Sequence, residues 1–214
     1  MRRTPLRDRA GTSLVELILF LGFFAACAGA VFSVLAFTNE QRLRQQIAAY
    51  VDQQGTQLLS VLTRRVRGAE HILWPETGTS STVLMLQMGD ASLHPTVIAL
   101  QSGALLLIER DHQQILSPEN MVISHFSVRN TSVALSGQSA LLSFRAERTI
   151  AFPGIRPFSR TFETVIALFP NHVAAGDECG CPLPACEEGR FHWNICTDGI
   201  CSESPIEIFC TCCG

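Results

Sequence analysis

Near its start the chain reads Gly11-Thr-Ser-Leu-Val-Glu16-Leu-Ile-Leu-Phe-Leu-Gly22, which opens an apolar run that continues to Phe37. Within residues 12–37 the one charged side chain is that of Glu16. These 26 residues exceed the roughly 20 that an α-helix needs to cross a bilayer, and they exceed the apolar core of a secretory signal. The run is therefore predicted to be a transmembrane helix.

Glu16 is unusual in such a run, because a carboxylate within a membrane helix costs a few kcal/mol and usually has a function. A plainer interpretation also stands, in which Glu16 lies at the headgroup level and is solvated. The preceding segment is basic, with Arg2, Arg3, Arg7 and Arg9 against Asp8. This charge before the run, and its scarcity just after, predict a cytoplasmic N-terminus and an extracytoplasmic remainder.

The basic leader, its terminal glycine and the acid at the fifth following position together resemble the class III signal of type IV prepilins and of type II secretion pseudopilins. In that family a membrane peptidase cleaves after the glycine and N-methylates the new first residue. The resemblance implies cleavage between Gly11 and Thr12 and methylation of Thr12, where the family usually has phenylalanine. It also implies that Glu16 meets the N-terminal amine of a subunit in the filament, which makes Glu16 an assembly residue.

Residues 38–68 continue the helical pattern beyond the membrane segment. Apolar side chains recur at spacings of three, four or seven residues, and no proline interrupts them. The members of this stripe are Leu43, Ile47, Tyr50, Val51, Leu58, Leu62 and Val66. We expect one helix from about Ser13 to about Arg67, ended by Gly68 and Pro75, with Gly55 as its weak point. The alternative is a membrane anchor followed by a separate coiled-coil-like stalk.

Residues 69–175 change to short apolar or alternating runs, which predicts a β-rich domain. The expected strands are 82–88, 96–100, 104–110, 122–129, 140–150 and 160–169, with turns such as Ser102-Gly103 between them. Six short strands without a long intervening helix favour a mainly antiparallel sheet, and the apolar stripe of the helix is the expected cover for one face. The predicted fold class is α+β, a long N-terminal helix packed on an antiparallel sheet.

This order of helix and strands is also similar to the pilin architecture, and most to J-type minor pseudopilins and W-type minor pilins. The phrases that carry this second resemblance include Leu105-Leu-Leu-Ile-Glu-Arg110, Val122-Ile-Ser-His-Phe126 and Phe162-Glu-Thr-Val-Ile-Ala-Leu168.

The sequence provides little sign of catalysis. The six histidines lack metal-ligand spacing such as HxxxH, and neither a GxSxG motif nor a glycine-rich phosphate loop is present. Glu147 and Glu163 alternate with apolar residues and are expected on the solvent face, paired with Arg145 or Arg160 across the sheet. We therefore expect a non-enzyme without a cofactor. Without residues 1–11 the formal net charge falls from −3 to −6, and a mildly acidic extracytoplasmic part argues against nucleic-acid binding.

The last segment, residues 176–214, is a cysteine-rich tail with seven acids and one arginine. Eight of the nine cysteines lie here: Cys179, Cys181, Cys186, Cys196, Cys201, Cys210, Cys212 and Cys213. On the oxidising side of a membrane an even number predicts disulfides, here four with 105 possible pairings. The apolar residues of the tail are expected to pack over the crosslinks or to form an exposed contact.

Metal binding is the rival interpretation of the tail, because Cys-Gly-Cys181 and Cys-Thr-Cys-Cys213 could chelate a soft ion. The missing paired CxxC and the extracytoplasmic location favour disulfides, and the same missing motif argues against a redox enzyme. Cys27 is expected to be a small apolar residue of the helix.

The sequence thus predicts residues 1–11 as leader, 12–37 as transmembrane helix, 38–68 as stalk, 69–175 as pilin-like domain and 176–214 as tail. The resemblance implies a minor pilin or pseudopilin of the cytoplasmic (inner) membrane or a cell-surface filament. Its implied partners are prepilin peptidase, other pilin subunits, an inner-membrane assembly platform and membrane lipid. The alternative is a single-pass membrane protein that displays a disulfide-rich binding module. A metal-binding or redox protein is the third hypothesis.

Overall fold

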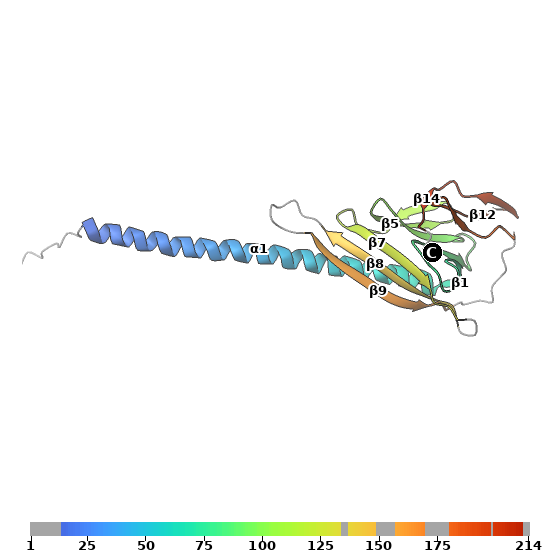
Figure 1. The fold of residues 1–214 in the computed structure, drawn as a ribbon, viewed down its shortest axis with the longest axis horizontal. Helices are drawn as coiled ribbons and strands as arrows, with labels where there is room; N and C mark the ends of the chain where they lie inside the picture. The colour runs from blue at the N-terminus through green and yellow to red at the C-terminus, as the bar shows by residue number, and fades with distance from the viewer. Residues whose placement is uncertain (1–13, 134–136, 149–156, 170–179, 198, 212–214) are drawn as a thin grey trace, which may run out of the picture. The chain divides into compact units, whose positions relative to one another are not determined.

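The computed structural model describes residues 14–133, 137–148, 157–169, 180–197 and 199–211. Two compact units are formed, Met1–Gln46 and Ile47–Gly214. The helix α1 (Leu14–Arg67) supplies the described part of the first unit and the start of the second. Its bounds confirm the predicted single helix from about Ser13 to about Arg67 (Figure 1).

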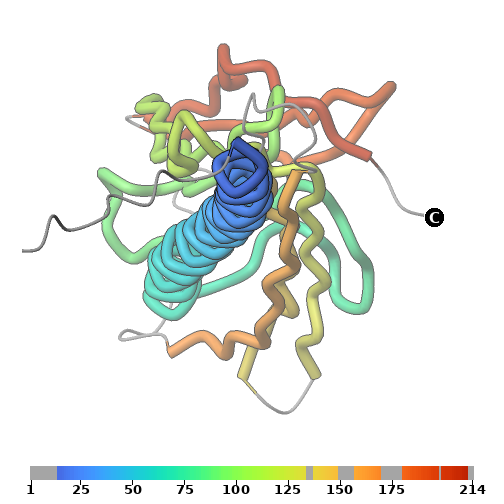
Figure 2. The backbone as a smooth tube through the Cα atoms, turned by 90° about the vertical axis from the view of Figure 1, so that its left-hand side faces the viewer, coloured from blue at the N-terminus to red at the C-terminus, as the bar shows by residue number. Residues whose placement is uncertain are grey.

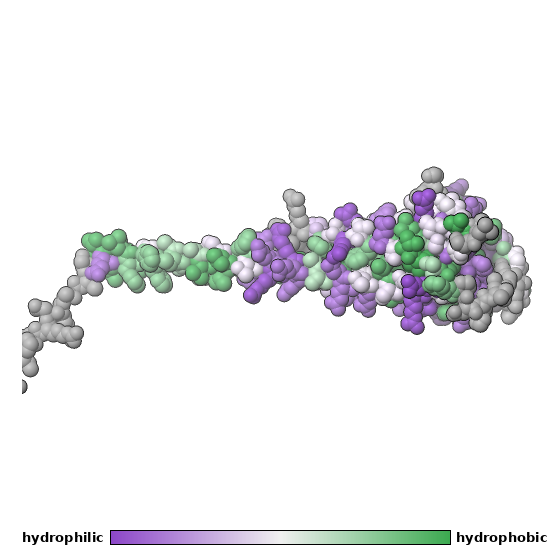
Figure 3. Space-filling view, turned by 90° about the horizontal axis from the view of Figure 1, so that it is seen from below, coloured by the Kyte–Doolittle hydropathy of each residue, from purple (hydrophilic) through white to green (hydrophobic). Residues whose placement is uncertain are grey.

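In the first unit the apolar side chains of α1 are exposed from Leu14 to Phe37, except that of Ala28, which is half-buried. Figure 3 shows these residues as a nearly continuous apolar surface. The helix is long and apolar enough to cross a membrane, which is weak evidence for membrane anchoring.

The second unit contains two larger antiparallel sheets (Figure 1). The five-stranded sheet has the order β1 (Ala69–Trp74), β3 (Val83–Met88), β4 (Thr96–Gln101), β5 (Ala104–Glu109) and β6 (His112–Ile115). The four-stranded sheet has the order β2 (Ser80–Ser81), β7 (Val122–Asn130), β8 (Ser139–Arg148) and β9 (Phe158–Ala167). Each of the six predicted strands has its counterpart among these, but they are divided between two sheets.

The predicted turn at Ser102-Gly103 joins β4 to β5. Both residues have positive φ, 51° and 78°, as a two-residue hairpin turn of this hand requires. The register pairs Gln101 with Ala104 directly across that turn.

The main core lies between the second half of α1 and the two sheets. Ile47, Val51, Leu58, Leu62 and Val66 are buried and belong to one cluster with side chains of both sheets. Figure 2 shows strands of both sheets beside the second half of α1, drawn in teal, with which they share this core. Five of the seven residues of the predicted apolar stripe therefore lie on the face that the sheets cover, while Leu43 and Tyr50 are half-buried.

The described residues of the tail form five short strands in two small sheets. One holds β10 (Ala185–Glu187), β11 (Arg190–His192) and β14 (Ile208–Phe209), and the other is the hairpin of β12 (Asn194–Thr197) and β13 (Ile200–Glu203).

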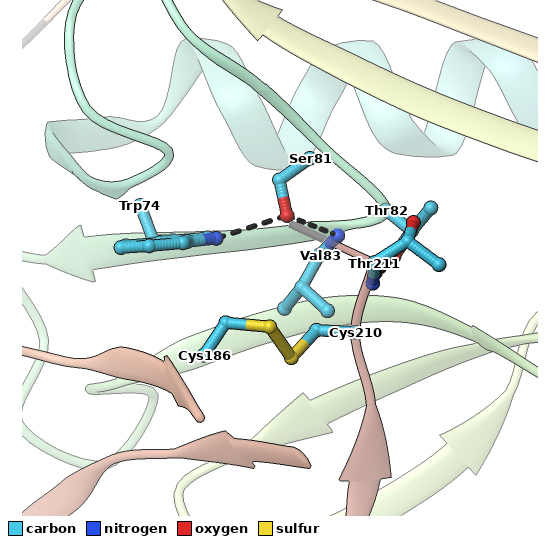
Figure 4. The surroundings of a disulfide bond; sticks show 7 residues. All are labelled: Trp74, Ser81, Thr82, Val83, Cys186, Cys210 and Thr211. Atoms are coloured by element: carbon cyan, nitrogen blue, oxygen red, sulfur yellow. Dashed lines mark hydrogen bonds between the residues drawn. A yellow bond between two sulfur atoms is a disulfide. The ribbon is translucent and has the colours of Figure 1, made fainter. Parts of the chain in front are cut away.

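These strands cover the second face of the five-stranded sheet. Alternate residues of β3 and β4 face away from α1, and there Val83, Met85 and Val97 join the buried Phe191 and Trp193 in a second core. The Thr211 amide donates a hydrogen bond of 3.1 Å to Thr82 Oγ1 and fixes this part of the tail beside the core (Figure 4). A sheet with one covered face was expected from the sequence, whereas this sheet buries both.

Candidate processing and assembly segment

Glu16 lies in the first turn of α1, and its side chain is exposed in the isolated chain. The first backbone N–H groups of a helix lack intrahelical acceptors, so an acid there is stabilised by the positive end of the helix dipole. This local effect explains why an acid is tolerated at the start of an apolar helix. It also leaves the carboxylate free to meet a cationic group from outside the chain.

The predicted cleavage site falls outside the described residues, because the description begins at Leu14. Gly11 and Thr12 therefore keep the roles that the sequence analysis assigned to them as predictions. Glu16 is the member of the signal whose place in the structure is known. It stands two residues after the first residue of α1.

Ion pairs and an aromatic contact join the second half of α1 to the sheets. Asp52 pairs with Arg160 of β9, and Arg65 Nη1 lies 3.0 Å from Glu109 Oε1 of β5. The guanidinium of Arg148 stacks 3.9 Å from the ring centre of Tyr50. The second half of α1, which was predicted to be a stalk, is therefore packed against the β-rich domain.

The predicted pairing of strand charges across the sheet is wrong among the described residues, because Arg145 pairs with Glu147 within the same strand, β8. Arg145 Nε lies 3.2 Å from Glu147 Oε1, and Glu163 is exposed as expected. Arg160 pairs instead with Asp52 on α1. The reason is the strand geometry, since Arg160 lies two residues before Phe162 and therefore on the same face of β9, the face toward the helix.

The tail cysteines form disulfides wherever the structure describes them. Cys181 is bonded to Cys201 and Cys186 to Cys210, and Cys196 is disulfide-bonded as well. The other three candidates, Cys179, Cys212 and Cys213, lie outside the described residues. Cys27 is a free thiol on the exposed surface of α1. Disulfide formation, which the sequence analysis preferred to metal binding, is thus confirmed for these five residues.

The apolar residues of the tail have both of the roles that the sequence left open. Phe191, Trp193 and Ile208 are buried in the second core, and Ile206 packs against it. Phe209 is 61% exposed. The Cys186–Cys210 disulfide belongs to the same core, close to Val83 (Figure 4). The tail therefore shares a core with the β-rich domain.

Sequence reasoning missed one polar feature, a hollow at the start of β1 and the end of β3. It has a volume of about 580 Å³ and is lined in part by Glu70, Gly89 and Asp90. The Asp90 carboxylate accepts hydrogen bonds from the Ser92 hydroxyl and amide, and these lower the pKa of Asp90. Its members are separated in sequence, so only the pairing of β1 with β3 brings them together.

Comparison of the whole chain with protein-family models, curated proteins and solved structures gave no match. In the part of the chain that the structure describes, His, Cys, Asp and Glu form no group of three or more that could hold a metal ion. The likeness to pilins therefore rests on the residues of the chain itself.

Proposed function

We propose that this protein is a minor pilin or pseudopilin, a structural subunit of a type IV pilus or of a type II secretion-like filament. The observation that carries the proposal is the position of the signal. The basic leader and Gly11 lie just before the 54-residue helix α1, and Glu16 lies in its first turn. The second half of this helix packs into a β-rich unit. The same helix would thus provide the membrane anchor, the assembly contact and part of the domain core.

In this proposal prepilin peptidase cuts after Gly11 and methylates Thr12. The J-type pseudopilins and W-type minor pilins remain the subunits that the order of elements resembles most. The subunit is held in the cytoplasmic membrane with its β-rich unit outside, where the disulfides of the tail persist. It then enters a filament through the apolar residues 12–37.

Glu16 has a physical role in this assembly. A carboxylate and an ammonium group that are both removed from water each need a partner, and pairing removes the desolvation penalty of both. The amine that cleavage creates on a subunit can supply the positive charge. Glu16 then stabilises the one axial position at which amine and carboxylate meet.

N-terminal sequencing of the mature protein tests the processing step, with a start at Thr12 as the expected result. Replacement of Gly11 by leucine should leave a longer, unprocessed chain on a gel. Gly22→Leu is the matched control, because this helix glycine has no atom within 4 Å of an added Cβ. A mature wild-type protein that keeps residues 1–11 would contradict the proposal.

Glu16→Ala tests the assembly step separately. The variant should insert in the membrane and be cleaved as the wild type is, but its share of the sheared filament fraction should fall by at least about tenfold, as loss of a buried charge partner predicts. Immunoblots of membrane and filament fractions measure both quantities. An unchanged filament share would remove the assembly role of Glu16.

The second candidate is a single-pass anchor that displays a disulfide-rich binding module. The disulfides and the exposed Phe209 are the observations that favour it. It predicts an uncleaved N-terminus and indifference to Glu16→Ala, so the same two experiments separate the candidates.

A further inference from the structure

The hollow at the start of β1 and the end of β3 contains a mostly buried glutamate. Glu70 is only 7% exposed, yet its side chain lines the hollow together with Asp90. Within the described residues the Glu70 carboxylate forms no hydrogen bond and no ion pair. The carboxylate oxygens are not among the fully buried unpaired atoms, so they face the hollow, where a positively charged group from outside could pair with them.

Gly89 makes room for this carboxylate. A Cβ atom at Gly89 would lie 2.6 Å from Glu70 Oε1, which is too close for a nonbonded contact. The glycine thus lets the carboxylate rest directly against the backbone of the β3 end. Asp90, the next residue, holds a second carboxylate at the rim, where the Ser92 amide and hydroxyl bind its Oδ1 at 2.9 and 2.7 Å.

The remaining walls of the hollow are apolar or small. Met88, Ala91 and Leu93 line it beside the acids. An arginine side chain matches this mixture, because its aliphatic stem packs on apolar surface while its guanidinium binds a carboxylate through two parallel hydrogen bonds. The volume of about 580 Å³ has room for a whole side chain.

A metal ion fits the hollow less well. Calcium takes about six to eight oxygen ligands, usually including several carboxylates. The hollow provides two carboxylates, and the described residues contain no cluster of three potential metal ligands.

We propose that this hollow, centred on Glu70, is a docking site for an arginine side chain presented by a partner polypeptide. Glu70 binds the guanidinium, Asp90 adds negative charge at the rim, and Met88 with Leu93 contacts the stem. The proposal depends on this site alone and is independent of processing at Gly11.

The test uses the full chain in detergent micelles and a minimal probe, Nα-acetyl-arginine methylamide. Titration should move the backbone amide signals of Glu70 and Gly89 in a saturable way in 1H–15N NMR spectra. The citrulline counterpart, equal in shape but neutral, should not. Glu70→Gln should weaken binding of the arginine probe by at least about tenfold, as expected for loss of a charge-assisted hydrogen bond. Glu119→Gln, at an exposed carboxylate outside the hollow, should bind as the wild type does.

A second measurement separates binding from a structural role. Because Glu70→Gln removes a buried charge that has no partner in the chain, the variant should unfold at the same or a higher temperature than the wild type. Any of three results would overturn the proposal: no saturable shift at Glu70 and Gly89, equal binding of the citrulline probe, or displacement of the arginine probe by calcium at lower concentration. A lower unfolding temperature of Glu70→Gln would overturn it as well, since it would indicate a carboxylate already satisfied within the fold.

Discussion

Gly55 lies in the middle of α1, where the ring of Phe162 from β9 packs against the helix backbone. A Cβ atom at Gly55 would overlap with that ring, and Phe162 in turn stacks on Phe144 with ring centres 5.1 Å apart. Glycine lowers helix propensity by about 1 kcal/mol relative to alanine, which is why this position looked like a weak point in the sequence. The structure instead makes it the contact point between helix and sheet.

Gly55→Ala should therefore destabilise the protein, although alanine is the better helix former. We expect a loss of about 1–3 kcal/mol in the free energy of unfolding, since overpacking outweighs the gain in propensity. Chemical denaturation followed by circular dichroism measures the change. Gly29→Ala is the matched control, because an added Cβ there meets no atom within 4 Å.

Combining Gly55→Ala with Phe162→Leu tests the same contact. The smaller side chain leaves space for the new methyl group, so the double variant should lose less than the sum of the two single losses. Strict additivity, or a Gly55→Ala variant more stable than the wild type, would contradict the close contact of this glycine with Phe162.

At the scale of elements, the helix and the strands with strong apolar patterns could be predicted from the sequence. The helix has a long apolar run, a regular stripe and no internal proline, so its observed ends differ little from the expected ones. β1 was missed because it follows Gly68 directly and is short, with a glutamate and a histidine among its apolar residues. β6 was missed because His112-Gln-Gln-Ile115 is fully exposed and is held by its backbone pairing with β5.

One of the two candidate sites could likewise be predicted from the sequence, and the other could not. The signal around Gly11 and Glu16 is local in sequence, so sequence reasoning could find it. The Glu70 hollow depends on residues about 20 positions apart that meet through the register Ala69–Met88, which no local pattern encodes. Disulfide pairing was equally out of reach, because 105 connectivities fit the same cysteines.

The Cys186–Cys210 disulfide is predicted to stabilise the tail as an element. It closes a loop with a sequence separation of 24 and lies in the second core. Replacing both residues by alanine should lower the free energy of unfolding by about 3.5 kcal/mol, the loop-entropy value for this length. Denaturation in urea measures it, and Cys27→Ala should have no effect, because this thiol is free.

Tryptophan fluorescence is an independent measure of the unfolding of this double variant. Both tryptophans of the chain belong to this core, with Trp193 1% exposed and Trp74 packed against Phe191 at 5.7 Å. Their emission should shift to the red at lower urea concentration in the double variant than in the wild type. Coincident transitions of the two proteins would show that the disulfide does not hold the tail on the sheet.

For the molecule as a whole, the tail is a structural part of the β-rich unit. The segment after residue 175 reads in sequence as a small, acidic, crosslinked addition. In the structure its buried aromatic side chains complete the second face of the five-stranded sheet, and Ile47–Gly214 forms one compact unit. The disulfides then stabilise the tail, which has few apolar residues of its own to hold it on the sheet.

Removal of residues 170–214 should therefore damage the whole unit. It would expose the fully buried Val83, Val97, Ala99 and Ile108, an apolar face that favours association between molecules. Size-exclusion chromatography of the truncated chain in detergent should show most of it in oligomers, with strong binding of a hydrophobic dye. The matched control carries the same truncation with Val83→Thr and Val97→Thr, which lower the apolar character of that face and should restore part of the monomer. A truncated chain that stays monomeric and unfolds like the full chain would instead make the tail an accessory module, as the display hypothesis requires.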